Sequence, residues 1–599
     1  MKRLGGEGGL RTTIALGLAL TACSSCAPAG AAQKAAATPD FGPNVLVFDP
    51  SMPAAEMQRK IEAVYQVQQH NEFGPERNAL LFLPGEYKLD VPLGFYTEVI
   101  GLGATPDAVH ITGNVHADAS LPRNNATCTF WRAMEGFSVT PAGGAIEATM
   151  QWAVSQAAPF RRMHVRGSMV LNQKGGWASG GWMADSVVDG TVASGTQQQW
   201  ISRNSEWGSW TGANWNMVFV GVKQPPAGEW PKPPYTKVSA TPVVREKPFL
   251  VVDSAGRWGV RVPALVRDSA GVSWHGGATP GKTIPLSRFY VARAGVDTAA
   301  TMNAALAAGK NLLLTPGIYE LAEPIRVTKP DAILMGLGFA TLKPVKGTAI
   351  LATADVDGIT IAGLLLDAGE QESPVLLEAG PGGSHLSHAR NPILLSDVFF
   401  RVGGAGAGSA KADLVVNAND TIIDHTWIWR ADHGKGVGWT QNLSDNGLIV
   451  NGNNVTAYGL FVEHHQQFQV LWNGNGGRTY FYQSEIPYDP PDQASWTSGA
   501  DATGANAIRN PVNGWASYKV ADAVTTHEAW GLGIYSVFRH PGVVLSRAIE
   551  VPKTPEVKFH HMITVALDNL GEISNVIDDT GGPAKPGKPR TEPKLGEFP

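Results

Sequence analysis

The sequence predicts an all-β protein made of two tandem right-handed parallel β-helix modules. Two observations predict this fold: a sequence unit that occurs twice, and short strand-like segments that recur at similar intervals later in the chain. The duplicated unit reads LFLPGEYKL at Leu81–Leu89 and LLTPGIYEL at Leu313–Leu321. Because a repeat marks a duplicated structural unit, it constrains the architecture more strongly than local propensity does.

Both copies of the unit have the same neighbours. Each copy follows a short helical pattern and precedes an apolar-Gly-Leu-Gly turn, so the order is helix, buried strand, Pro-Gly turn, strand and Gly turn. The helical patterns span 54–66 and 299–308, and the Gly turns are Ile100–Gly103 and Met335–Gly338. We therefore expect one module at residues 41–222 and a second at 285–580.

The coils of a β-helix can be counted in the second module. Five segments share a short strand, a bend and a second strand, and their last residues are 34, 29, 33 and 22 residues apart. One coil of a parallel β-helix needs about this length, and loop insertions account for the variation. The segments are Ile359–Asp367, Ile393–Arg401, Ile422–Arg430, Val455–Glu463 and Arg478–Glu485.

The first module shows the same spacing of strand-like segments, but less regularly. Its expected strands are Gly136–Thr140, Arg162–Arg166, Asp185–Asp189 and Asn216–Val220. Residues 223–284 are expected to be a linker, Pro-rich at Lys223–Pro234, with bridging strands around Phe249–Val252. Residues 581–599 are rich in Pro and Lys and are expected to form a disordered tail.

Residues 1–40 are expected to be a lipoprotein signal and tether. Lys2, Arg3 and Arg11 form a basic region, and Thr12–Ala22 is an apolar stretch too short to remain as a membrane span. Leu20-Thr-Ala-Cys23 matches a bacterial lipobox, so Cys23 is expected to be acylated. The alternative is ordinary signal cleavage near Ala29–Ala32. In both cases the protein is exported, either to the cell surface or periplasm as an anchored lipoprotein or as a secreted protein.

Composition excludes several partners. Charged residues make up 17% of the chain, the net charge is −5 and no run of Lys or Arg exceeds two residues, so the chain lacks the basic footprint of nucleic-acid binding. Eighteen Trp residues fit a neutral, ring-shaped ligand such as a polysaccharide.

With only three Cys residues no disulfide framework is expected. No metal is expected, because the His and Asp pairs at 424–425 and 432–433 match no metal-binding spacing. We also expect a monomer without a cofactor.

The candidate chemistry lies at the strand ends of the second module. If the coils stack, Asp367, Arg401, Arg430, Glu463 and Glu485 take equivalent places on one face. Neighbouring strands lie about 4.8 Å apart, so Glu463 and Glu485 should be close and one of them should retain its proton toward neutral pH. A solvated polar ladder with Arg partners is the structural alternative.

Aromatic and amide side chains surround this acidic pair. Sugar sites combine aromatic faces with amide and carboxylate groups, and a purely structural ladder needs no such combination. The neighbours taken as candidate substrate-binding residues are His464, Trp472, Tyr480, Tyr482, Gln483 and, further away, Trp439.

With these features the chain resembles glycoside hydrolase family 55, the tandem β-helix β-1,3-glucanases of the pectate-lyase-like superfamily. The resemblance covers about residues 41–570 and rests on the paired modules and on Tyr482-Gln-Ser-Glu-Ile-Pro-Tyr488. It implies a hydrolase of neutral β-1,3-glucan, expected to be exo-acting and inverting. Endo attack stays open from the sequence, because the choice depends on whether loops block one end of the cleft. The resemblance further implies that Glu485 is the general acid with Glu463 beside it, and that Gln and Ser residues of the first module hold the attacking water. Gln156 and Ser179 are the candidates here.

Two other function classes remain open from the sequence. A polysaccharide lyase on a β-helix would need cationic groups against a uronate, and Arg401 and Arg430 are the available ones. A non-catalytic glycan-binding surface lipoprotein would bind glycan without releasing new reducing ends.

Overall fold

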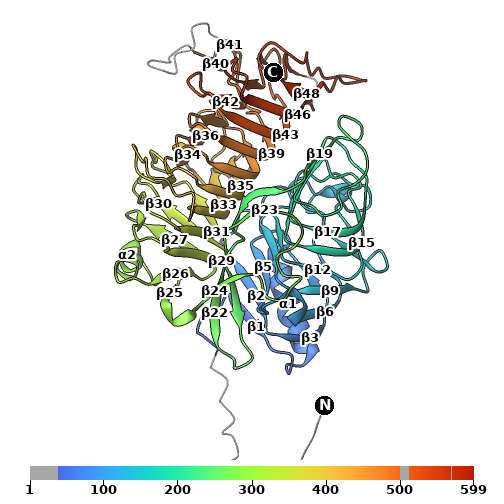
Figure 1. Cartoon of the computed structure of the whole chain (residues 1–599), viewed down its shortest axis with the longest axis vertical. Coiled ribbons are helices and arrows are strands. Elements are labelled where there is room, and N and C mark those ends of the chain that lie inside the picture. Colours follow the sequence, from blue (N-terminus) through green and yellow to red (C-terminus); the bar gives the residue numbers. More distant parts are fainter. Residues whose placement is uncertain (1–37, 500–511, 568–569) are drawn as a thin grey trace, which may run out of the picture.

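Two parallel β-helix modules lie side by side in the computed structural model (Figure 1), which describes residues 38–499, 512–567 and 570–599. This arrangement confirms the expected all-β fold of two modules. The first module is drawn in blue to cyan, and the coils of the second rise from green to red. Cys23 and the rest of the expected signal lie outside the described residues. Within the described residues, no helix is long and apolar enough to cross a membrane.

Each module is built on one sheet that faces the other module and one that faces away. The facing sheet of the first module runs in the order β1 (Val45–Phe48), β2 (Asn78–Phe82), β5 (Thr97–Gly101), β8 (Arg132–Glu135), β11 (Pro159–Arg161), β14 (Trp182–Ala184), β16 (Gln199–Arg203), β18 (Asn216–Val220), β19 (Tyr235–Val238). The outer sheet contains β3 (Gly85–Lys88), β6 (Val109–Gly113), β9 (Ser138–Pro141), β12 (His164–Val165), β15 (Val187–Ala193), β13 (Ser168–Val170), β10 (Thr149–Gln151) and β17 (Glu206–Thr211).

The second module repeats this plan with more coils. Its facing sheet runs in the order β25 (Phe289–Ala292), β26 (Asn311–Leu314), β29 (Ile333–Pro344), β31 (Thr360–Asp367), β33 (Leu394–Val402), β35 (Ile422–Arg430), β37 (Thr456–Glu463), β39 (Gly477–Glu485), β43 (His527–Ser536), β46 (Val557–Ala566), β48 (Lys594–Phe598), with β27 (Ile318–Leu321) beside β29. Its outer sheet runs in the order β28 (Ile325–Val327), β30 (Leu351–Thr353), β32 (Leu377–Ala379), β34 (Ala410–Val416), β36 (Ser444–Val450), β38 (Val470–Trp472), β42 (Tyr518–Val520), β45 (Ile549–Glu550).

The duplicated sequence unit has the same structural role in both modules. Its tyrosine hydroxyl donates to two backbone carbonyls: Tyr87 to Phe48 at 3.1 Å and Leu83 at 2.7 Å, and Tyr319 to Ala292 at 2.8 Å and Thr315 at 2.9 Å. The preceding helices are α1 (Ala54–Gln68) and α2 (Ala299–Ala307). The repeated tyrosine therefore ties the first strand of each module to the Pro-Gly turn.

The segment between the modules forms two small antiparallel sheets. They are β20 (Thr241–Val244) with β23 (Val266–Ser269), and β21 (Phe249–Val252) with β22 (Trp258–Pro263) and β24 (Gly281–Pro285). Leu250 and Val260 of the second sheet are buried in a cluster that also contains Leu81 of the first module and Leu313 of the second. The linker strands thus pack under the contact between the modules.

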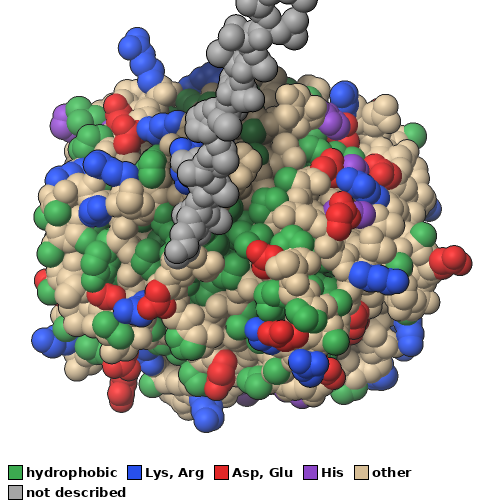
Figure 2. Space-filling model, turned by 90° about the horizontal axis from the view of Figure 1, so that it is seen from below, with side chains coloured by type: hydrophobic (Ala, Val, Ile, Leu, Met, Phe, Trp, Pro, Cys, Tyr) green, Lys and Arg blue, Asp and Glu red, His purple; other side chains and the backbone are tan. Residues whose placement is uncertain are grey.

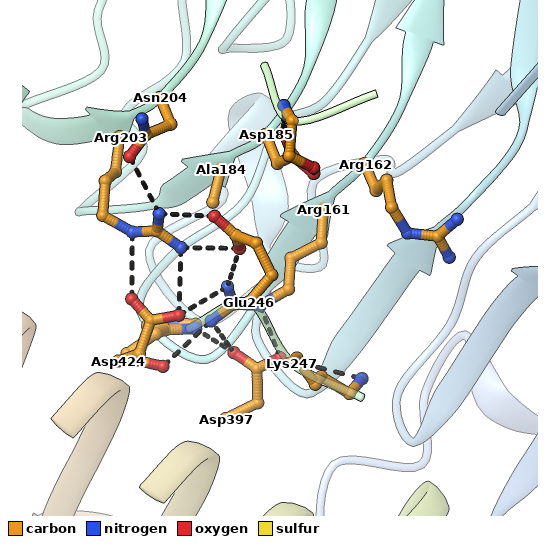
Figure 3. A network of polar contacts seen from close by, with 12 residues as sticks. Arg161, Arg162, Ala184, Asp185, Arg203, Asn204, Glu246, Lys247, Asp397 and Asp424 are labelled. Atoms are coloured by element: carbon orange, nitrogen blue, oxygen red, sulfur yellow. Dashed lines mark hydrogen bonds and ion pairs between the residues drawn. The ribbon is translucent and has the colours of Figure 1, made fainter. Parts of the chain in front are cut away.

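A buried network of charges also joins the two modules (Figure 3). Arg161 and Arg203 from the first module contact Asp424 from the second, at 2.8 and 3.0 Å. Arg161 also pairs with Asp397 at 2.7 Å, and Arg203 pairs with Glu246 of the linker at 2.6 Å. Because buried charges are tolerated only with well-placed partners, this network fixes how one module sits on the other.

Two features of the surface complete the fold. The expectation of a disordered tail at 581–599 was wrong, because Lys594–Phe598 forms β48 antiparallel to β46. Phe598 and Leu595 pack against the core and cover the last strand of the sheet, which a free polar tail would leave open. Seen from the end where the modules begin, positive and negative side chains are interspersed over the surface (Figure 2), as the small net charge suggests.

Candidate active site

A cavity of about 250 Å³ opens between the modules near the carboxyl ends of β37 and β39. Both modules contribute to its wall. The first module supplies Thr127, Cys128, Phe130, Gln156, Ser179 and Gln198, and the second supplies Trp427, Trp429, Asp432, His433, Glu463, His464, Glu485, Tyr488 and Leu567. Five residues predicted from the sequence therefore meet in one cleft, namely Gln156, Ser179, Glu463, His464 and Glu485.

Strand register brings the two glutamates together. Asp367 pairs with Arg401, Arg401 with Trp429, and Trp429 with Glu463 in successive parallel strands. In the next coil the backbone N–H of His464 donates to the carbonyl of Glu485 at 2.8 Å, so Glu485 follows Glu463 in the row.

Arg430 does not belong to this row, which corrects the expected ladder. It is paired with Val402, one residue out of step, because the coil from β33 to β35 is one residue shorter than the strand ends suggested. Its guanidinium binds Asp489 at 2.9 Å and the carbonyls of Asn442 and His464.

Glu463 is buried and held by two donors from different modules. The indole N–H of Trp427 donates to its carboxylate at 2.8 Å, and the amide of Gln156 donates at 3.1 Å. Burial raises the pKa of Glu463 to about 7, while the amide of Gln483 and the donors Trp427 and Gln156 oppose this increase. These donors favour the ionised carboxylate over the protonated one.

Glu485 is the better proton carrier of the pair. Burial, then the neighbouring charges of Glu463 and Asp432, raise the pKa of Glu485 well above its ordinary value. The hydroxyl of Tyr488 contacts its carboxyl group. Because Glu463 accepts hydrogen bonds from both Trp427 and Gln156, whereas Glu485 contacts the single hydroxyl of Tyr488, the shared proton of this pair is expected on Glu485.

Two buried polar atoms in the cleft wall are left without a partner. Among the described residues, neither Oε1 of Gln156 nor Oγ of Ser179 has a hydrogen-bond partner. The two residues are tied together because the backbone N–H of Gln156 donates to the carbonyl of Ser179 at 3.3 Å. Gln156 also adopts a φ of 33°, an uncommon conformation for this residue type. Unpartnered polar atoms of this kind suit a bound water or a sugar hydroxyl.

One wall of the cleft is aromatic. The rings of Trp427 and Trp429 stack at 4.7 Å with an interplanar angle of 20°, and Phe130 packs against Trp427 at 4.8 Å. No sequence pattern distinguishes the Trp residues that face the cleft, since Trp427 and Trp429 both lie within a strand that is buried throughout. Aromatic faces beside carboxylates are typical of sugar sites.

The imidazole of His464 lines the cavity and is in its neutral form. Burial lowers the pKa of His464 to about 4. Its Nδ1 lies 3.2 Å from the carbonyl of Ile486, so the neutral tautomer carries its proton on Nδ1. Its ring meets that of Tyr488 at 4.3 Å.

Other predicted substrate-binding residues lie elsewhere. Trp472 and Tyr482 are buried in the interior of the second module, where Tyr482 hydrogen-bonds Ser517 at 2.8 Å. Tyr480 stacks between Tyr458 and Trp530 in the contact between the modules.

Gln483 and Trp439 are not part of the cavity wall. Gln483 is buried beside Glu463, where its amide lowers the pKa of that carboxyl group without forming a hydrogen bond of good geometry to any described residue. Trp439 is half-buried under the guanidinium of Arg430, 5.7 Å away. Of these two residues, only Gln483 therefore lies close enough to Glu463 to influence the acidic pair.

Known proteins match both the sequence and this geometry. Residues 289–485 match the family model of the LAM55 pectate lyase-like domain. The chain is 48% identical over 556 residues to an exo-beta-1,3-glucanase of Streptomyces sp. (strain SirexAA-E / ActE), covering 92% of this chain and 89% of that one. The solved structure of sacteLam55A from Streptomyces sp. SirexAA-E superimposes with a TM-score of 0.89 at 46% identity, over 94% of this chain and 100% of that one.

A second solved structure gives the same match. It is a variant of sacteLam55A in complex with glucose, again with a TM-score of 0.89 and 46% identity over 94% of this chain and 100% of that one. Identity at this level over nearly the whole length of both chains shows common family membership. The chain is therefore a member of glycoside hydrolase family 55.

Proposed function

We propose that this protein is an exo-acting, inverting β-1,3-glucanase in which Glu485 is the general acid. The observation that carries the proposal is the pair of carboxyl groups of Glu485 and Glu463, both with a raised pKa, in one cavity wall with the unpartnered polar atoms of Gln156 and Ser179. The glucanase name of the Streptomyces relative supports the same substrate class.

The proposed mechanism follows from the positions of these groups. Glu485 donates its proton to the glycosidic oxygen as the bond to the anomeric carbon breaks. A water that donates hydrogen bonds to Oε1 of Gln156 and Oγ of Ser179 attacks the anomeric carbon from the opposite face of the sugar. It releases one proton to solvent, and solvent restores the proton of Glu485 for the next turnover. Inverting enzymes leave room for such a water, whereas retaining enzymes place a carboxylate nucleophile there.

Glu463 has a supporting role in this scheme. Its negative charge keeps the pKa of Glu485 high, and it holds the amide of Gln156 so that Oε1 points away from it. The negative charge of Glu463 also favours the positive charge that develops on the sugar ring in the transition state.

The two arginines considered as uronate-binding groups of a lyase, Arg401 and Arg430, are both paired with carboxylates of this chain. Arg401 forms two hydrogen bonds with Asp367, at 2.9 and 2.8 Å, and Arg430 forms two with Asp489, at 3.0 and 2.9 Å. Neither guanidinium is available to neutralise a uronate, which argues for a neutral glucan.

The test is to incubate the purified protein with a panel of β-1,3-, β-1,4- and β-1,6-glucans and to identify the products. Glucose released from β-1,3-glucan, without longer intermediates at early times, is the expected result. Binding without new reducing ends would instead indicate a glycan-binding protein. Unsaturated products would indicate a lyase.

We also propose that the protein is exported and anchored through an acylated Cys23, and that it acts as a monomer. Support comes from the lipobox and the preceding apolar stretch. Two lipid chains at one Cys residue would hold the protein stably on a membrane. Mass spectrometry of the mature N-terminus tests this, and an unmodified terminus further along the chain would contradict it. Sedimentation of the soluble form tests the oligomeric state.

A further inference from the structure

We propose that Glu72, Cys128 and His433 form a binding site for a thiophilic divalent cation such as Zn²⁺. We further propose that the bound ion inhibits the enzyme, and this second part rests on the proposed glucanase function. The site includes His433 of the pair at 432–433 considered from the sequence, and it adds Glu72 and Cys128 from the first module.

The three side chains meet at the edge of the catalytic cleft. One ligand atom from each, a carboxylate oxygen, the sulfur and an imidazole nitrogen, lies within 4.8 Å of the other two. Glu72 follows α1, Cys128 precedes β8, and His433 follows β35. Oε1 of Glu72 is 2.7 Å from Nε2 of His433. Small side-chain shifts would bring all three atoms onto one ion.

The donor set suits zinc or a chemically similar ion. Zn²⁺ binds thiolate, imidazole and carboxylate, and three protein ligands leave a fourth position for a solvent molecule. Hard cations such as Mg²⁺ and Ca²⁺ prefer oxygen ligands, so the sulfur discriminates against them. The side chains of His433 and Glu72 are 36% and 24% exposed, so an ion can enter from the solvent.

The carboxylate of Asp432, on the ring nitrogen of His433 that faces away from Glu72, supports metal binding. Nδ1 of His433 lies 2.7 Å from Asp432, which leaves Nε2 directed at Glu72. Asp432 is itself held by the guanidinium of Arg539 at 3.1 Å. A carboxylate on the far nitrogen of a histidine is the usual support of a metal ligand, because it orients the ring and increases its basicity. Metal ligands bind in their deprotonated forms, so binding of the ion would be accompanied by release of protons from the ligands.

Inhibition follows from the position of the site. Cys128 and His433 line the same cavity as Glu463 and Glu485, so an ion with its solvent ligand would occupy space needed by the substrate. The added positive charge would also lower the pKa of Glu485 and promote loss of the catalytic proton. In addition, the ion would link the two modules, so it should stabilise the folded protein.

The test uses the full chain with Cys23 and Cys26 changed to Ser, so that any thiolate signal comes from Cys128. Titration with Co²⁺ should give a thiolate-to-cobalt charge-transfer band at one ion per chain, and Zn²⁺ should displace the cobalt and raise the melting temperature. Zn²⁺ should also lower glucan hydrolysis at least ~10-fold, and a chelator should restore it.

Matched variants assign the ligands. Cys128→Ser should abolish the band, Glu72→Gln should weaken Zn²⁺ binding, and Asp432→Asn should weaken it about 10- to 100-fold. The control is His116→Ala, since His116 also lies between two carboxylates, Asp90 and Asp118, but outside the cleft. This control should leave Zn²⁺ affinity unchanged. Each variant is compared with its own metal-free activity.

The outcomes separate the site from the proposed function. Absence of the cobalt band, or equally tight Zn²⁺ binding by Cys128→Ser, overturns the site. Zn²⁺ saturation without any loss of hydrolysis overturns the inhibitory role. A normal cobalt band in a protein that hydrolyses no glucan would leave the site standing and contradict the glucanase assignment alone.

Discussion

The side-chain amide of Gln156 donates a 3.1 Å hydrogen bond to Glu463 across the contact between the two modules. This bond fixes the orientation of the amide, so its oxygen is the atom left free toward the cleft. In the proposed mechanism, one module supplies the acid and the other supplies the groups that hold the water. Both modules form the wall of the cavity, and the charge network and the apolar contact hold the two modules together there.

Replacing the proposed acid should abolish turnover while preserving binding. Glu485→Gln is nearly isosteric but cannot donate a proton to the leaving oxygen, so kcat should fall by about 10²-fold or more. Affinity for laminarin-like glucan, measured by calorimetry, should change little. Turnover close to that of the unmodified protein would show that another residue is the acid.

The water-holding residues should affect kcat more than KM. Ser179→Ala removes one polar atom that would position the nucleophile, and Gln156→Met removes Oε1 together with the amide N–H that is bonded to Glu463. Misplacement of a reacting group costs about 10²-fold. Steady-state kinetics on one glucan measures both constants. Gln151→Met, an amide of the same module that bonds Asp118 outside the cleft, is the control for folding. A rise in KM alone would assign Gln156 and Ser179 to sugar binding.

The alkaline limb of the pH–activity profile, where activity falls as the pH rises, should depend on Glu463. Burial, then Glu463 and Asp432, raise the pKa of Glu485, so the active protonated form persists at low pH and is lost as the pH rises through that raised pKa. Glu463→Gln removes a like charge, so the pKa of Glu485 should fall and the limb should move to lower pH. The pH dependence of kcat/KM measures this shift. A limb that stays in place would mean that the two carboxyl groups are not coupled.

The network between the modules should be critical for stability. Arg203→Met leaves Asp424 and Glu246 with fewer partners in a buried setting, and removal of one member of such a network costs about 3–5 kcal/mol. Denaturant unfolding of the full chain measures the loss. Arg257→Met, whose exposed pair with Asp253 should contribute little, is the control. Equal stability of the two variants would argue against this role of the network.

Much of the fold followed from the sequence because a β-helix repeats short, regular units. The segment expected at Ile422–Arg430 coincides with β35, and the other coil strands of the second module differ at their ends by one residue. Register was harder to predict, since loops of unequal length shift one coil against the next. That is why Arg430 was placed in the wrong row while Glu463 and Glu485 were placed together.

Side-chain direction limited the prediction of the site. Tyr482 and Ser484 point into the module and Glu485 points out, as strand alternation requires, yet nearness in sequence suggested that Tyr482 flanks the acid. The trio of Glu72, Cys128 and His433 had no local signal, because its members lie in three distant segments. Gln156 and Ser179 were found through the family resemblance and not through any pattern of spacing.

The stereochemistry of the first product tests the central claim most directly. Proton NMR during early hydrolysis of a β-1,3-glucan should show the α anomer of the released sugar, because water attacks from the side opposite to Glu485. The expected signal is followed before mutarotation equilibrates the anomers. A β anomer as the first product would contradict the account, since it would require a carboxylate nucleophile in place of the water held by Gln156 and Ser179.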